Sequence, residues 1–113
     1  MIKKTFKAEA SQNQVNRKNF WSSIYKRASN SWGSYYRRRL QVAYRHLIPE
    51  GASVLEVGCA RGDLLSVLKP SVGVGIDFCP EALEVARSAH PHFEFVLADA
   101  HHLDLGSRTF DYI

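Results

Sequence analysis

The segment 54–65, VLEVGCARGDLL, constrains the fold of this chain more than any other feature. A short apolar run ends at a carboxylate, passes through Gly58 and Gly62, and continues into a leucine-rich segment. Glycine permits positive φ angles and lets a ligand approach the backbone, so the pattern predicts a strand that turns sharply into a helix. Free N–H groups at the start of such a helix favour an anionic group. The segment therefore predicts a ligand-binding turn at the carboxyl end of a strand.

The remainder of residues 51–113 alternates between strand and helix patterns. Strands are predicted over 53–57, 72–76 and 93–98, with a fourth beginning at 110, and helices over 63–68 and 80–89. The connection 99–109 holds only a short turn or helix. Alternation with short connections indicates βαβ units. We therefore expect an α/β fold with a Rossmann-like parallel sheet of three to four strands, incomplete in this chain, preceded by two N-terminal helices.

The first fifty residues have a different character. Residues 1–12 are polar without periodicity and are expected to be disordered. Two helices follow, each predicted from an apolar stripe: one over 14–28 with Phe20, Trp21, Ile24, Tyr25 and Ala28, and one with Tyr36, Leu40, Ala43 and Leu47. We expect residues 1–50 to be a basic helical extension or lid, and residues 51–113 to be the N-terminal part of a Rossmann-like domain. Because Phe110–Ile113 begins a strand with no exit loop, a truncated chain is also expected.

Charge divides the chain in the same place. Residues 1–50 carry eleven Lys or Arg and two Glu, whereas residues 51–113 carry four Lys or Arg and nine Asp or Glu. The run Arg37, Arg38 and Arg39 fits an anionic partner such as nucleic acid, and the alternative is a solvated helix face. A basic nucleic-acid or anionic-partner interaction module with a vestigial Rossmann unit is accordingly a second hypothesis.

Other features of the sequence argue against several classes of protein. No apolar run is long enough to span a bilayer and no hydrophobic signal core follows the N-terminus, so a cytoplasmic protein without a membrane span is expected. Cys59 and Cys79 show no CxxC or disulfide-framework spacing. No metal site is predicted, because the histidines lie in loops without helical ligand spacing. These are His90 and His92, and His101 and His102 beside Asp99 and Asp104.

Glu56, Asp77 and Asp99 each end or follow a predicted strand. Ligands in open parallel sheets bind at the carboxyl ends of the strands, so the three carboxylates should share one edge. A dinucleotide is disfavoured, since Asp63 replaces the last glycine of G-x-G-x-x-G and repels a pyrophosphate. S-adenosylmethionine fits better, because it carries a sulfonium and an ammonium; Asp77 would accept from its ribose hydroxyls and Asp99 from its adenine amino group. Each carboxylate also has a local alternative: loop amides for Glu56, a helix cap for Asp77 and a turn for Asp99.

The segments VLEVGCARGDLL, VGVGIDFCPEALEVAR, FEFVLADAHHLD and FDYI resemble, in order and spacing, the motifs of class I S-adenosylmethionine-dependent methyltransferases. The resemblance covers roughly residues 36–113 and is closest to methyltransferase domains associated with bacterial glycosyltransferases, which implies a fused or neighbouring glycosyltransferase as a partner. It departs at Ala60, where the family usually has glycine, and at Cys79, where serine is common. The cofactor-binding residues that it implies are Glu56, Gly58, Cys59, Ala60, Gly62, Asp77, Phe78, Asp99 and Ala100.

The resemblance implies methyl transfer to an acceptor that the sequence does not identify. A catalytic group, where this class uses one, usually follows the fourth strand, so no catalytic residue is predicted. Trp32, Tyr35 and Tyr36 have two interpretations: an aromatic lid near the sulfonium, or, as we prefer, core packing over the sheet.

Overall fold

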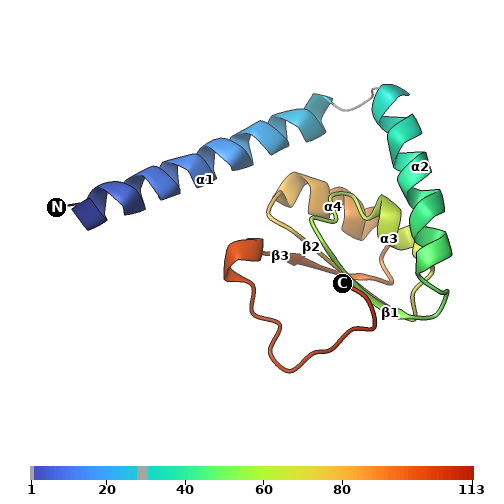
Figure 1. Cartoon of the computed structure of the whole chain (residues 1–113). Helices are drawn as coiled ribbons and strands as arrows, with labels where there is room; N and C mark the ends of the chain where they lie inside the picture. The colour runs from blue at the N-terminus through green and yellow to red at the C-terminus, as the bar shows by residue number, and fades with distance from the viewer. Residues whose placement is uncertain (1, 28–30) are drawn as a thin grey trace.

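The computed structural model describes the backbone of residues 2–27 and 31–113 and the side chains of residues 12–24 and 34–113. Two helices come first and an alternating α/β unit follows (Figure 1). The elements are α1 (Ile2–Arg27), α2 (Ser31–Leu47), β1 (Ser53–Val57), α3 (Asp63–Leu68), β2 (Val72–Asp77), α4 (Pro80–Ala89), β3 (Glu94–Leu97) and the 3-10 turn η1 (Ala100–His102). The predicted α/β order and the short turn in the connection 99–109 are confirmed.

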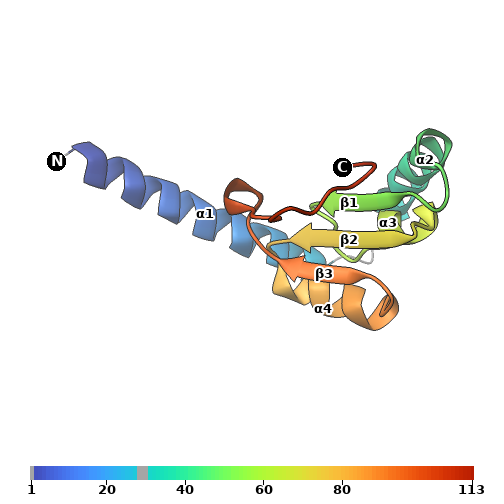
Figure 2. The ribbon, with the colours of Figure 1, turned by 90° about the horizontal axis from the view of Figure 1, so that it is seen from below.

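The three strands form a parallel sheet in the order β1-β2-β3. Figure 2 shows the three arrows pointing the same way, with α1 lying at the end where they finish. The chain then returns to the free side of β1, where Tyr112 forms a parallel bridge with Val54. Chain order therefore reverses at β1, which makes the carboxyl end of β1 the switch point at which such sheets bind ligands.

The segment predicted to begin a fourth strand pairs with β1 at one residue, through the parallel bridge between Tyr112 and Val54. The N–H groups of Asp111 and Tyr112 both donate to the carbonyl oxygen of Ser53, at 3.0 and 3.2 Å. The Asp111 carboxylate also accepts from the N–H and the hydroxyl of Ser53, each at 2.8 Å. The N–H of Leu55 in turn donates to the carbonyl oxygen of Tyr112 at 3.0 Å, which completes the hydrogen-bond pattern of a parallel pair.

Different segments of the chain cover the two faces of the sheet. Figure 1 shows α3 and α4 on one face, while the segment after β3 passes across the other. The helix side holds one buried cluster, made of Val54, Cys59, Leu65, Leu68, Leu83, Ala86 and Phe95. The opposite side holds a second cluster of Leu55, Val74 and Ile76, covered by Val96, Ala98, Leu103, Leu105 and Phe110. Alternating directions of side chains along each strand produce this division.

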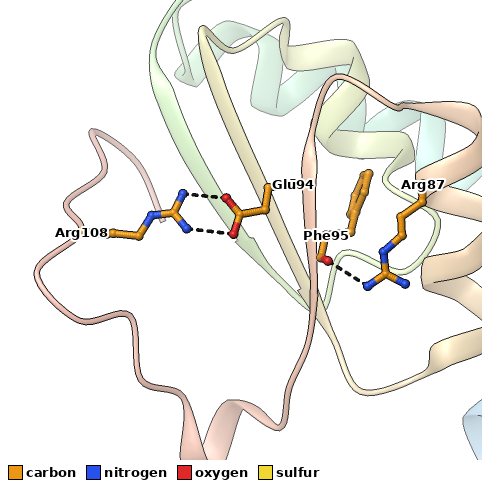
Figure 3. Close-up of polar contacts among 4 residues, drawn as sticks. All are labelled: Arg87, Glu94, Phe95 and Arg108. Atoms are coloured by element: carbon orange, nitrogen blue, oxygen red, sulfur yellow. Dashed lines mark hydrogen bonds and ion pairs between the residues drawn. The ribbon is translucent and has the colours of Figure 1, made fainter.

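The connection from β3 back to β1 is attached to the sheet by polar contacts (Figure 3). Both terminal nitrogens of Arg108 donate to the Glu94 carboxylate, each at 3.0 Å, and the guanidinium lies 5.5 Å from the centre of the Phe110 ring. On the other side of β3, Arg87 donates to the carbonyl oxygen of Phe95 at 2.9 Å. The Arg108–Glu94 pair attaches the return segment to β3, and the Arg87 contact attaches α4 to the same strand.

The N-terminal helices differ from the prediction. Disorder over residues 1–12 is wrong, because α1 begins at Ile2. Lys, Ala, Glu and Gln favour helix, and neither glycine nor proline interrupts them. Among the described helices, none combines the length and the apolar character that crossing a membrane requires.

The predicted stripe on α2 is also only partly right. Leu40 is half-buried, but Tyr36 and Leu47 are exposed, at 65% and 69%. Tyr35 is exposed as well, at 69%, so core packing of these two tyrosines is wrong. The physical reason is that α2 packs against α3 rather than over the sheet, which leaves most of its surface in solvent. The side chains of Tyr25, Ala28 and Trp32 lie outside the described residues.

Candidate functional site

The turn between β1 and α3 has three residues in the left-handed region. Gly58, Ala60 and Gly62 have φ angles of 80°, 50° and 77°. The N–H groups of Gly58 and Cys59 both donate to the carbonyl oxygen of Ile76, at 2.7 and 2.9 Å, which fastens the turn to β2. A side chain added at Gly58 would meet no atom within 4 Å, so the space in front of this residue is open. Ala60 adopts the same backbone conformation with a Cβ atom in place.

Gly62 is required by packing as well as by its φ angle. A Cβ atom at this position would lie 2.8 Å from the ring of Phe95 and 3.2 Å from that of His90. Gly62 is buried and precedes the first residue of α3. It therefore allows the turn to sit directly on the helix-side core.

Asp77 ends β2 and is almost completely buried, at 6% exposed. One carboxylate oxygen accepts from the N–H of Ala60 at 2.9 Å, and the other accepts from the N–H of Cys79 at 2.9 Å. Asp77 thus joins the turn after β1 to the turn before α4; the N-cap residue of α4 is Cys79, so Asp77 does not itself cap the helix. Its ribose contact stays a prediction, although a carboxylate has lone pairs for further donors.

Glu56 lies beside this turn and has the most perturbed carboxyl group among the described residues. Burial raises its pKa from 4.5 to about 7; an N–H of Leu65 opposes this, while the carboxylates of Asp63 and Asp77 add to it. Its Oε2 atom is buried and has no hydrogen-bond partner among the described residues. A buried acceptor without a partner is costly and indicates a ligand donor.

Two clefts open at this edge of the sheet. The turn cleft, about 180 Å³, lies between the β1–α3 turn and α2. It is lined by Arg37, Leu40, Gln41, Glu56, Gly58, Cys59, Ala60, Arg61, Asp63 and Leu64. It therefore brings two carboxylates, two guanidinium groups and an open glycine backbone together.

The second cleft, the Asp99 cleft, has about 200 Å³ and lies under α1. It is lined by Gln14, Arg17, Lys18, Trp21, Phe78, Asp99, Ala100 and His101. The Asp99 carboxylate accepts from the N–H of His101 at 3.0 Å and from the side-chain amide of Gln14. These donors, His101 first, hold the pKa of Asp99 below its ordinary value. The turn alternative for Asp99 is thus correct, and the same carboxylate also faces the cleft.

The structure divides the predicted site residues between the two clefts. Four line the turn cleft, three line the Asp99 cleft, and Gly62 and Asp77 line neither but shape the turn. Sequence reasoning missed the residues that the N-terminal helices supply: Gln14, Arg17, Lys18 and Trp21 on α1, and Leu40 and Gln41 on α2. Their spacings of three, four and seven positions are a helical-face signal that was available.

Neither cysteine provides a reactive thiol at this site. Both are buried, and burial, with the carboxylates of Glu56 and Asp77, raises the pKa of Cys59 to about 12. A thiol in that environment stays protonated and is a poor nucleophile. Across residues 12–24 and 34–113, no three His, Cys, Asp or Glu side chains are grouped closely enough to hold a metal ion.

Comparisons with known proteins agree with this geometry. Residues 54–113 match the methyltransferase domain family. The chain is 34% identical over 71 residues to the 2-phytyl-1,4-naphtoquinone methyltransferase of Thermosynechococcus vestitus, a match that covers 56% of this chain and 32% of that protein. The chain therefore spans about a third of the length of this curated relative.

Two solved structures have a similar fold. A TehB-like SAM-dependent methyltransferase from Corynebacterium glutamicum superposes with a TM-score of 0.55 at 21% identity, covering 92% of this chain and 53% of that one. SAM-bound CalS10, an amino pentose methyltransferase from Micromonospora echinaspora, superposes with a TM-score of 0.51 at 25% identity, covering 77% and 37%. With the family match over more than half of its length, the chain belongs to the methyltransferase domain family, in the class I S-adenosylmethionine-dependent group.

Proposed function

We propose that this protein binds S-adenosylmethionine across the two clefts and is the cofactor-binding part of a methyltransferase. The observation that carries the proposal is the turn cleft, where the unpartnered buried oxygen of Glu56 and the Arg37 side chain line one space beside the open backbone of Gly58. The amino-acid end of the cofactor is a zwitterion. The cleft offers carboxylates, Glu56 and Asp63, for the ammonium and guanidinium groups, Arg37 and Arg61, for the carboxylate.

The other predicted contacts follow from the second cleft. Phe78 supplies an aromatic surface for the adenine ring, and Asp99 with Ala100 lies where the adenine edge would be bound. Asp77 supports both ends of the proposed cofactor site, because its carboxylate holds the backbone at Ala60 and at Cys79 in place. Residues of suitable chemistry therefore line the clefts proposed for both ends of the cofactor.

S-adenosylmethionine, when bound, supplies a methyl group already activated by a positively charged sulfur. The chain's own residues have the tasks of binding, orienting and excluding water. The helices α1 and α2 do the last of these, because each forms one wall of a cleft. The curated relative and CalS10 carry names with different acceptors, a naphthoquinone and an amino pentose, so neither assigns an acceptor here.

Calorimetric titration of the purified protein with S-adenosylmethionine and, separately, with NADH tests the proposal. We expect binding of the first ligand only. Glu56→Gln should weaken it about tenfold, because a neutral amide replaces the charged partner of the ammonium. Glu84→Gln is the matched control, since Glu84 is exposed on α4 and lines neither cleft. Binding of NADH, or equal affinities for S-adenosylmethionine in the wild type and both variants, would contradict the proposal.

A further inference from the structure

A groove beside the turn cleft collects arginine side chains from two elements. This arginine groove lies between α2 and α3 and is open to solvent, with about 520 Å³. It is lined by Ser34, Arg37, Arg38, Gln41, Arg61, Asp63, Ser66 and Val67. The arginines and Gln41 carry nitrogen donors, whereas the Ser66 hydroxyl already donates to the carbonyl oxygen of Asp63 at 2.8 Å. Three guanidinium groups and one carboxylate line this groove.

The groove adjoins the turn cleft, since both are lined by Arg37, Gln41, Arg61 and Asp63. The turn cleft is the one assigned above to the amino-acid end of the cofactor, the end that is bonded to the methyl-bearing sulfur. A molecule held in the groove would therefore lie beside the group to be transferred.

The chemistry of the groove selects a doubly charged oxyanion. Guanidinium groups bind phosphate through paired N–H donors, and hydroxyl and amide donors complete its coordination. Arg38 and Arg61 would hold a phosphate monoester, which carries nearly two negative charges at neutral pH, while Arg37 is left to bind the carboxylate of the cofactor. A nucleic-acid surface would extend the positive charge along the helix, but Arg39, next in the chain, lines neither the groove nor a cleft.

We propose that the arginine groove anchors a phosphate group of the methyl acceptor, so that the acceptor is a phosphorylated small molecule. The proposal rests on the function proposed above for the position of the methyl group, but the phosphate site itself does not. Arg38 and Ser66 line the groove without lining the turn cleft, and they define the part that belongs to the acceptor.

The test is a titration with inorganic phosphate at constant ionic strength and about pH 8, followed by calorimetry, with and without saturating S-adenosylhomocysteine. We expect one phosphate to bind in both cases. Arg38→Gln should weaken it about tenfold, because a charged donor to the oxyanion is lost. Arg39→Gln, which removes the same charge from the next residue of the same helix, should change the affinity less than twofold.

The outcomes separate the two proposals. Failure of S-adenosylhomocysteine to bind would contradict the proposed function. The titration of cofactor-free protein would still test phosphate binding in the arginine groove. Binding of S-adenosylhomocysteine without binding of phosphate would contradict only the proposed phosphate site. Three other results would overturn the proposed phosphate site. The affinity for phosphate could fall equally in Arg38→Gln and Arg39→Gln, or the protein could bind acetate as tightly as phosphate. Phosphate could also compete with S-adenosylhomocysteine. Competition would instead assign these arginines to the carboxylate of the cofactor.

Discussion

At the scale of single residues, Ala60 is where the sequence and the backbone conformation disagree. Its φ angle of 50° is left-handed, a conformation that costs a residue with a Cβ atom about 1–2 kcal/mol. Glycine removes this cost but loses about 0.5–1 kcal/mol of chain entropy on folding. Ala60→Gly should therefore raise the free energy of unfolding by about 0.5–1 kcal/mol in urea denaturation. Ala43→Gly, on the exposed face of α2, should lower it by a similar amount; destabilisation by both changes would refute the assignment.

Glu56 makes stability depend on pH in the direction opposite to that of a salt-bridged carboxylate. Because its pKa is about 7 in the folded protein and 4.5 ordinarily, the folded state binds the extra proton between these values. Its contribution to stability is therefore greatest below pH 4.5, falls as pH rises to 7, and then stays level. Glu56→Gln should become more stable relative to wild type between pH 5 and pH 8, by up to about 3 kcal/mol. Urea unfolding at both pH values measures this, with Glu84→Gln as control; an unchanged pH dependence in Glu56→Gln would exclude the buried acid.

At the scale of elements, α1 is held against the α/β unit by a few polar contacts. The hydroxyl of Ser22 donates to Glu81 at 3.2 Å, and the side-chain amide of Gln14 donates to Asp99. The hydroxyl of the next residue, Ser23, instead donates within its own helix, to the carbonyl oxygen of Phe20. These contacts position α1 as a wall of the Asp99 cleft.

Releasing either contact should loosen α1. A hydrogen bond of this kind contributes about 1 kcal/mol, so Ser22→Ala should speed hydrogen exchange of the 14–21 amides roughly fivefold. Ser23→Ala should leave those rates unchanged, because its hydroxyl makes no contact with another element. Equal exchange in the two variants would mean that α1 is held by other contacts.

The α/β unit was predictable because its signals are local and repeated. Alternation of strand and helix patterns located β1, β2, β3, α3 and α4, and carboxylates after strands identified one edge. The dual use of Asp77 was not predictable, since its partners at Ala60 and Cys79 meet it only when β1 and β2 pair. The N-terminal helices were misjudged for a related reason. Apolar periodicity predicts a buried face, but burial depends on a partner surface, and α2 has only the narrow surface of α3.

At the scale of the whole molecule, the proposed cofactor site is assembled from segments far apart in the sequence. The turn cleft joins α2 to the β1–α3 turn, whereas the Asp99 cleft joins α1 to the segment after β3. The pairing of β1 with β2 and of β2 with β3 brings both clefts to one sheet edge. A ligand that spans both should therefore act on segments far apart in sequence.

Adenosine and methionine, the two fragments of the cofactor, should distinguish the Asp99 cleft from the turn cleft. In hydrogen exchange, adenosine should protect residues 14–21 and 99–101, because the Asp99 cleft holds the aromatic surface and the adenine acceptor. Methionine should protect residues 37–41 and 58–64, because the turn cleft holds Glu56 and Arg37. S-adenosylhomocysteine should protect all four segments and bind far more tightly than either fragment, since one association then satisfies both clefts. Protection of residues 58–64 by adenosine alone would reverse the assignment of the two clefts. If S-adenosylhomocysteine protected the segments of only one cleft, the two clefts would not be parts of one site.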